Sequence, residues 1–158
     1  MTARARRLPS CIGFVLAALA PASALSAEVV PTAYACTFKS GSSLVYSKSV
    51  YRSKKATPIT FDIDAINLDG QRAELVSPNG RGPLRIVRAV GANHYLEAVT
   101  EGYLNLTTIY QKDDRRGAYP AVHSRHFGVL GEPIVAQYTG FCTAKGEATP
   151  AAKTGGKP

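Results

Sequence analysis

The chain has 158 residues, enough for one domain with a hydrophobic core and too few for two domains of ordinary size. Its formal net charge is +8, but Arg4, Arg6 and Arg7 belong to an N-terminal leader. Without them, 16 Lys and Arg face 11 Asp and Glu, a net charge of +5. This moderate charge, with no base-stacking aromatic motif, argues against a nucleic-acid-binding protein.

Residues 1–27 have the three parts of a secretory signal peptide. A basic end precedes an apolar run at residues 12–20, and small residues follow at 22–27. Cleavage is expected after Ala24 or after Ala27. No later stretch approaches about 18 consecutive apolar residues, so no transmembrane segment is expected. The sequence therefore predicts a periplasmic or secreted protein.

The rest of the chain has the period-2 alternation of β-strands and no helix-period segment. Asp69-Gly70 and Asn79-Gly80 are hairpin turns by composition, and the Gly/Ser-rich residues 40–43 are a turn as well. We predict about eight short strands. The segments with strand patterns are residues 34–38, 44–51, 59–66, 71–77, 84–90, 94–100, 103–111, 119–127 and 134–142.

The cysteines indicate how these strands are arranged. Cys11 lies in the leader, which leaves Cys36 and Cys142 as an expected disulfide in an oxidising compartment. They lie in the first and last predicted strands, which are neighbours in an up-and-down barrel. We therefore predict an all-β fold, a small antiparallel barrel of about eight strands closed by this disulfide. A β-sandwich is the alternative.

The barrel domain is expected over residues 34–143. Residues 144–158 contain no aromatic or branched aliphatic side chain, which predicts a disordered tail. We expect five aliphatic side chains to point into the barrel, whose interior they either fill or leave open for one small apolar ligand. These side chains are Ile63, Leu75, Ile86, Leu104 and Leu106.

Residues 121–142 hold two of the three histidines, but their spacing argues against a local catalytic or metal site. His123 and His126 are three apart, so on a strand they point to opposite faces, and Ser124 points away from His123. No Gly-x-Ser-x-Gly elbow or phosphate-binding loop occurs. Asp62 and Asp64 are expected on a solvated outer face. No metal, cofactor or catalytic residue is predicted.

Two resemblances accompany these patterns. The C-terminal part of the chain resembles a group of short secreted bacterial proteins of uncharacterised function. The resemblance rests on Ser-Arg-His at residues 124–126, the Gly-Glu-Pro that follows, and Gln-Tyr-Thr-Gly-Phe-Cys at 137–142. The signal peptide and the Tyr-Ala-Cys at 34–36 look like those of small periplasmic lysozyme inhibitors. Their Ser/Gly-rich inhibitory motif is not found at the corresponding place. The second resemblance therefore concerns the fold.

The sequence as a whole predicts an exported, non-enzymatic binding protein of the cell envelope. It would recognise a small apolar ligand or a protein partner, and the oligomeric state stays open. The alternatives are a periplasmic protein inhibitor and a small hydrolase or isomerase that uses His123 or His126 with a carboxylate. The expected binding residues are His123, Arg125, His126, Tyr110 and Tyr138.

Overall fold

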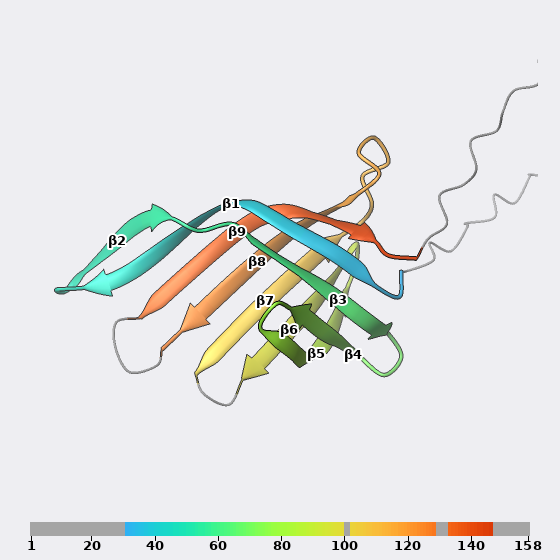
Figure 1. Ribbon diagram of the computed structural model, residues 1–158, viewed down its shortest axis with the longest axis horizontal. Coiled ribbons are helices and arrows are strands. Elements are labelled where there is room, and N and C mark those ends of the chain that lie inside the picture. Colours follow the sequence, from blue (N-terminus) through green and yellow to red (C-terminus); the bar gives the residue numbers. More distant parts are fainter. Residues whose placement is uncertain (1–30, 100–101, 129–132, 147–158) are drawn as a thin grey trace, which may run out of the picture.

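The computed structural model describes residues 31–99, 102–128 and 133–146, and within these ranges it contains nine antiparallel strands and no helix (Figure 1). Residues 1–30, which include the predicted signal peptide, and residues 147–158 lie outside the described part of the chain, so their predicted roles stay predictions. The strands are β1 (Tyr34–Ser47), β2 (Val50–Lys55), β3 (Ile59–Asn67), β4 (Arg72–Ser77), β5 (Gly80–Ala89), β6 (Ala92–Val99), β7 (Tyr103–Tyr110), β8 (Tyr119–Phe127) and β9 (Ile134–Ala144).

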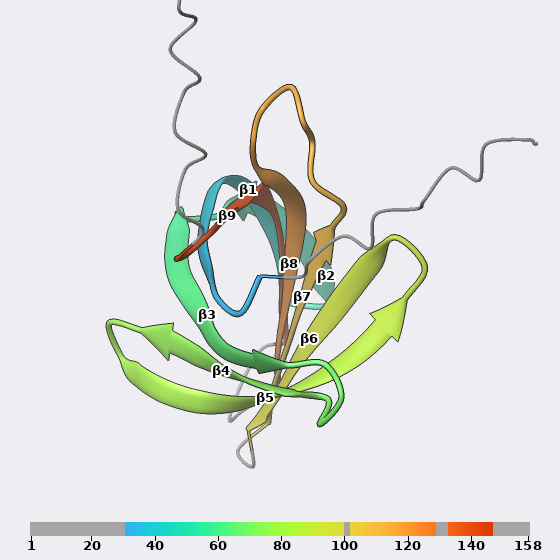
Figure 2. The ribbon, with the colours of Figure 1, turned by 90° about the vertical axis from the view of Figure 1, so that its right-hand side faces the viewer.

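Eight of these strands form a closed barrel, as predicted. They follow one another in the order β1-β3-β4-β5-β6-β7-β8-β9, and β9 pairs with β1 to close the ring. Figure 2, turned by 90° from Figure 1, shows the strands curving round a common interior. Cys36 and Cys142 are register partners on β1 and β9 and form the expected disulfide.

The remaining strand, β2, is not part of the ring and forms with β1 a hairpin that projects beyond the barrel (Figure 1). β2 pairs with the second half of β1, and the Ala56 amide donates to the Gly41 carbonyl at 3.0 Å. β3 then pairs with the first half of β1, so β2 and β3 follow the same edge of one long strand. The predicted single strand over residues 44–51 is thus wrong, because the chain turns at Lys48 and Ser49. Both have positive φ, at 50° and 64°, the geometry of a two-residue hairpin turn that usually contains Gly or Asn.

The predicted turn at residues 40–43 is also wrong, because β1 continues through these residues. The β1–β9 register shifts between Thr37 and Ser40, a bulge that bends the strand. Gly41 then lies opposite Tyr138, where an added Cβ would approach the Tyr138 ring to 2.6 Å. Small residues serve here to let an aromatic ring pack against the backbone.

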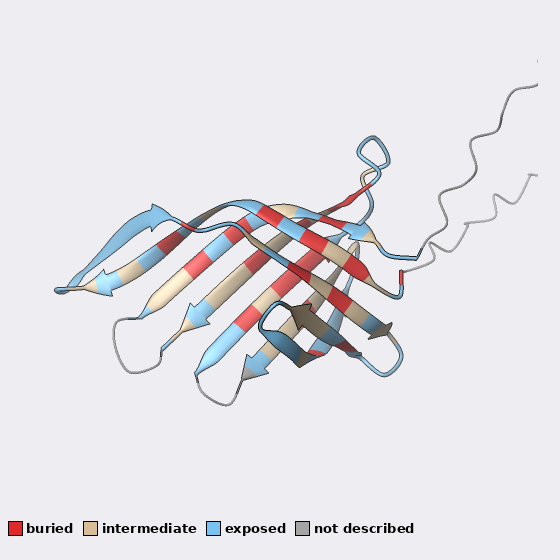
Figure 3. Cartoon of the chain, in the orientation of Figure 1, coloured by how far each residue is buried: buried red, intermediate tan, exposed pale blue. Residues whose placement is uncertain are grey.

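The core lies inside the barrel, and Figure 3 shows its buried residues alternating with exposed ones along the strands. Ile63 and Ile86 are buried and Leu75 is partly buried, as expected. Leu104 and Leu106, however, do not lie in the core. Leu104 is 44% exposed, whereas Asn105, Thr107 and Ile109 on the other face of β7 are buried. Pairing with β8 sets this parity, because Thr107 stands opposite His123 and Ile109 opposite Ala121.

The Asp69-Gly70 turn lies between β3 and β4 as predicted. The next hairpin is also present, but its turn residues are Pro78 and Asn79, because Gly80 pairs with Ser77 as the first residue of β5. The last strand extends to Ala144, one residue into the predicted tail. Next to it, the Lys145 ammonium donates to Asp62 at 2.8 Å and to Asp64 at 3.0 Å. The two aspartates therefore tie the end of β9 to the outside of β3.

Candidate functional site

One end of the barrel opens into a cavity of about 340 Å³, which we call the mouth. It lies at the end from which the β1–β2 hairpin projects. Its walls come from the start of β3, the β4–β5 turn and inward-facing positions of β6, β7 and β8. The lining residues are Ile59, Thr60, Phe61, Leu75, Ser77, Pro78, Asn79, Gly80, Arg81, Gly82, Glu97, Tyr103, Asn105, His123 and Arg125.

Strand register places the polar lining residues of the mouth side by side. Glu97 on β6 is the partner of Asn105 on β7, and Asn105 is the partner of Arg125 on β8. We call these three the mouth row. One step deeper, the same pairing aligns four side chains from β6 to β9, which we call the inner row. The inner row consists of Tyr95, Thr107, His123 and Tyr138.

Within the described ranges, only part of the hydrogen-bonding capacity of the mouth row is used. The Asn105 side-chain amide donates to Glu97 Oε2 at 2.6 Å, but its Oδ1 is buried without a partner among the described residues. The Arg125 guanidinium lies 4.7 Å from the centre of the Phe127 ring and forms no ion pair with a described carboxylate. A buried amide oxygen without a hydrogen bond costs about 1–3 kcal/mol, so Asn105 has an acceptor site to offer.

His123 closes the floor of the mouth as a neutral aromatic side chain. Its Nδ1 is 2.9 Å from Thr107 Oγ1, and its ring centre lies 5.0 Å from that of Phe61 and 5.6 Å from that of Phe38. Burial, together with the positive charge of Arg125, lowers the pKa of His123 to about 4. The imidazole is therefore uncharged at neutral pH. Within the described ranges it forms no hydrogen bond with a carboxylate that would orient it as a general base.

The arrangement suits binding of a small molecule with mixed chemistry. Asn105 and Glu97 offer oxygen acceptors, Arg125 offers N–H donors with a positive charge, and Phe61 and Tyr103 offer aromatic surface. Deeper in the barrel, Phe38, Ile63 and Cys142 have no exposed surface. These deeper side chains offer a ligand no accessible surface, whereas the mouth provides a cavity.

The five predicted binding residues occupy four different environments. His123 and Arg125 line the mouth. Tyr138 is buried beneath it, with its ring centre 5.9 Å from that of His123. His126 is exposed on the outer face, and Tyr110, 45% exposed, borders a cavity of about 230 Å³ at the opposite end of the barrel. The structure thus brings together three of the five.

Two residues of the mouth row were not predicted from the sequence. Glu97 lies on β6, where the sequence gave no reason to prefer one face. The local pattern in β7 even favoured the wrong face, because Leu104 and Leu106 alternate with Asn105 and Thr107. A polar side chain at a barrel-facing position could have been recognised from sequence only with the pairing between β6, β7 and β8 already known.

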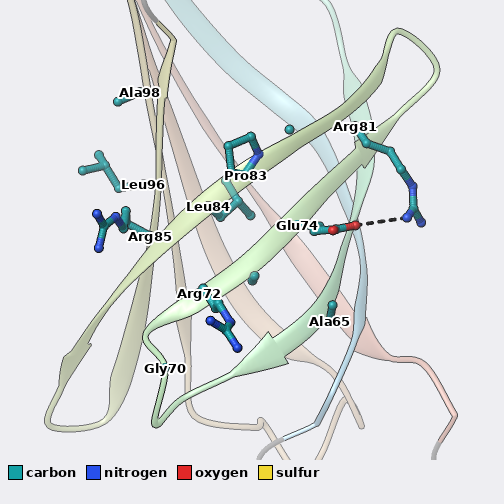
Figure 4. Close-up of a pocket in the computed structure, with 12 residues that line it drawn as sticks. Ala65, Gly70, Arg72, Glu74, Arg81, Pro83, Leu84, Arg85, Leu96 and Ala98 are labelled. Carbon is teal, nitrogen blue, oxygen red and sulfur yellow. Dashed lines mark hydrogen bonds and ion pairs between the residues drawn. The ribbon is translucent and has the colours of Figure 1, made fainter.

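A second hollow, of about 820 Å³, lies along the β4–β5 hairpin (Figure 4). Arg81 there is paired with Glu74 at 3.0 Å and with Asp64 at 3.6 Å. Arg72 and Arg85 stand opposite each other in the register and are exposed. This hollow is broader than the mouth and contains no buried unsatisfied polar atom among the described residues. We therefore regard the mouth as the stronger candidate.

Comparisons with protein-family models, curated proteins and solved structures found no match for this chain. Residues of the described ranges form no cluster of three or more His, Cys, Asp or Glu that could hold a metal ion. Nor do these ranges include a helix long and apolar enough to cross a membrane. The site must therefore be interpreted from its own geometry.

Proposed function

We propose that this protein is an exported, non-enzymatic binding protein of the cell envelope whose barrel mouth holds a small amphipathic ligand. The ligand would carry an N–H or O–H donor for Asn105 Oδ1 and an anionic or strongly accepting group for Arg125. Its apolar part would lie against Phe61 and Tyr103. The cavity of about 340 Å³ is at the lower end of the range of small-molecule sites.

The observation that carries this proposal is the buried amide oxygen of Asn105, which has no hydrogen-bond partner among the described residues. Its neighbour in the mouth row, Arg125, forms no ion pair with a carboxylate of those residues. Buried polar atoms in folded proteins are nearly always hydrogen-bonded. β7 buries Asn105 and Thr107 while leaving Leu104 exposed, although the reverse arrangement would bury more apolar surface. Such a local conflict with stability is expected where a site has a function.

Export is part of the proposal and rests on two observations. The disulfide between Cys36 and Cys142 fits an oxidising compartment, and the first 27 residues have the pattern of a signal peptide. Expression of the full chain with a C-terminal tag should yield a shortened, oxidised protein outside the cytoplasm. An uncleaved, reduced protein in the cytoplasm would contradict export and leave the ligand site to be tested separately.

The ligand site can be tested with an NMR fragment screen on the oxidised protein. Small carboxylic acids that also carry an amide or hydroxyl donor should shift the side-chain amide resonances of Asn105 and the backbone resonances of β8. Arg125→Gln should weaken the binding of these fragments on the order of tenfold. The matched variant Arg85→Gln on β5 should leave their affinity unchanged. Fragments that shift neither region, or that bind both variants equally, would refute the proposal.

A further inference from the structure

The β1–β2 hairpin has an unpaired edge. Among the described strands, β2 pairs with β1 alone, and all six of its residues are exposed. The Ala56 amide bonds to Gly41, and antiparallel partners alternate between bonded and non-bonded pairs. Arg52 and Lys54 therefore use their backbone groups toward β1. Tyr51, Ser53 and Lys55 direct their N–H and C=O groups outward, where another strand could pair with them.

The hairpin is also strongly basic. From residue 29 to residue 61 the sequence contains no Asp or Glu, whereas it contains five Lys and Arg. Four of them lie in the turn and in β2. They are Lys48, Arg52, Lys54 and Lys55. A partner with negative charge would be attracted to this arm over a distance of about a Debye length, roughly 8 Å at physiological salt.

Strand register distributes these charges over two faces. Arg52 and Lys54 are partners of Val45 and Ser43, and Ser43 is buried next to Ala136 on the face continuous with the barrel interior. Tyr51 lies on the opposite face, where its ring packs against that of Tyr46 at a tilt of 53° with ring centres 4.9 Å apart, and it is 60% exposed. Lys55 shares this second face. A flat surface such as a membrane would contact only one of the two.

We propose that the β1–β2 hairpin is a docking arm that binds an extended acidic segment of a protein partner, which adds as a strand beside β2. Side chains of an added strand alternate between the two faces. The partner's side chains on the inner face would contact Arg52 and Lys54, so every second residue of the partner segment would be Asp or Glu. Those between them would be apolar and would pack beside Tyr51. The free edge supplies affinity through the main chain, and the alternating chemistry supplies specificity.

Edge strands often carry lysine to prevent association, so the docking arm has to be distinguished from a merely protected edge. The probe is a short capped peptide that alternates Glu and Val, titrated into the oxidised protein and followed by amide hydrogen exchange. The amides of Tyr51, Ser53 and Lys55 should become protected on binding, whereas those of Arg52 and Lys54 should be protected before and after. A peptide that alternates Lys and Val should not bind.

Two variants separate main-chain pairing from charge. Ser53→Pro removes an outward N–H that β1 does not use, so it should abolish peptide binding, and Ser53→Ala should not. Lys54→Glu should weaken binding on the order of tenfold, and Arg85→Glu on β5 should have little effect. Loss of amide protection at Arg52 and Lys54 would show that Ser53→Pro disturbs the hairpin. In that case the wild-type protein is tested instead with a Glu–Val peptide that is N-methylated at alternate amides, and this peptide should not bind.

Several outcomes would overturn the docking arm. Equal binding of the N-methylated and parent peptides would mean that charge alone attracts the peptide. Absence of peptide binding together with binding to phosphatidylglycerol vesicles would make the hairpin a membrane contact. Absence of binding to either probe would make Arg52, Lys54 and Lys55 a protected edge. None of these results bears on Asn105 or Arg125, so the ligand site is tested independently.

Discussion

The two halves of the barrel differ in how well their buried groups are satisfied. We call the half that contains the disulfide the closed half, and the other half leads to the mouth. In the closed half, the disulfide joins β1 to β9, the Tyr34 and Tyr119 rings meet at 5.0 Å, and the core side chains are apolar. In the half that leads to the mouth, Asn105 has a buried oxygen with no partner among the described residues, and His123 is held in its neutral form. One half is arranged for stability, whereas the other gives up stability at particular side chains.

The inner row marks the boundary between these halves. Tyr138 and Tyr95 contribute rings to the core, while a hydrogen bond of 2.9 Å joins Thr107 Oγ1 and His123 Nδ1. In this barrel the apolar, disulfide-bonded half supplies stability that the polar residues of the mouth lack. Substitutions in the two halves should therefore change stability in different ways.

The largest effect is expected in the closed half, from removal of the disulfide. The double variant Cys36→Ala/Cys142→Ala opens a covalent loop of 106 residues. The chain-entropy estimate for such a loop gives a loss of up to about 4–5 kcal/mol in the free energy of unfolding. Urea denaturation followed by circular dichroism measures it, and the reduced wild-type protein is the matched control. A loss below about 1 kcal/mol would show that the β1–β9 hydrogen bonds close the barrel by themselves.

In the mouth half, the largest effect should come from protonation of His123. Its pKa is about 4 in the folded protein and about 6.5 when unfolded, so the unfolded chain binds more protons between these values. The stability from the neutral imidazole is complete above pH 6.5 and is lost as the pH falls to 4, by up to about 3 kcal/mol. His123→Phe should flatten this pH dependence, and the exposed His126→Gln should retain it. Equal slopes in both variants would exclude His123 as the cause.

Much of the barrel could be predicted because its information is local. The alternation at residues 59–66 and the Asp-Gly turn fix strands and a hairpin without knowledge of distant residues, and the Asn-Gly pair locates the next hairpin to within one residue. The disulfide then follows from two cysteines in the terminal strands. The hairpin at Lys48 and Ser49 could not be predicted because neither residue is one that usually adopts positive φ. Similarly, Gly41 suggested a turn although its role depends on the Tyr138 ring of another strand.

The candidate site was harder to predict because it depends on pairing between strands. Strand parity correctly separated His123 from His126, and it placed His123 and Arg125 on one face. It could not show that this face meets Asn105 of β7, since Leu104 and Leu106 favoured the opposite orientation. The residues that conflict with a simple core pattern are the ones that form the mouth row, and a single strand does not reveal why.

The smallest of these effects tests how far the unsatisfied polarity extends toward the closed half. The Tyr95 side chain is 1% exposed, and its hydroxyl has no hydrogen-bond partner among the described residues. Burial raises the pKa of this hydroxyl far above its usual value, so it stays protonated and needs an acceptor. Tyr95→Phe removes the orphaned group while keeping the ring, and it should raise the free energy of unfolding by about 1 kcal/mol.

The matched control is Tyr110→Phe on the outer face, where the hydroxyl is accessible to water. This variant should change the free energy of unfolding by less than about 0.5 kcal/mol. A loss of about 1 kcal/mol or more in Tyr95→Phe would mean that the hydroxyl is bonded in solution, for instance to a buried water molecule. The polar site would then end at the mouth row. A gain in stability would instead place Tyr95 with Asn105, among the side chains whose polar atoms weaken the fold.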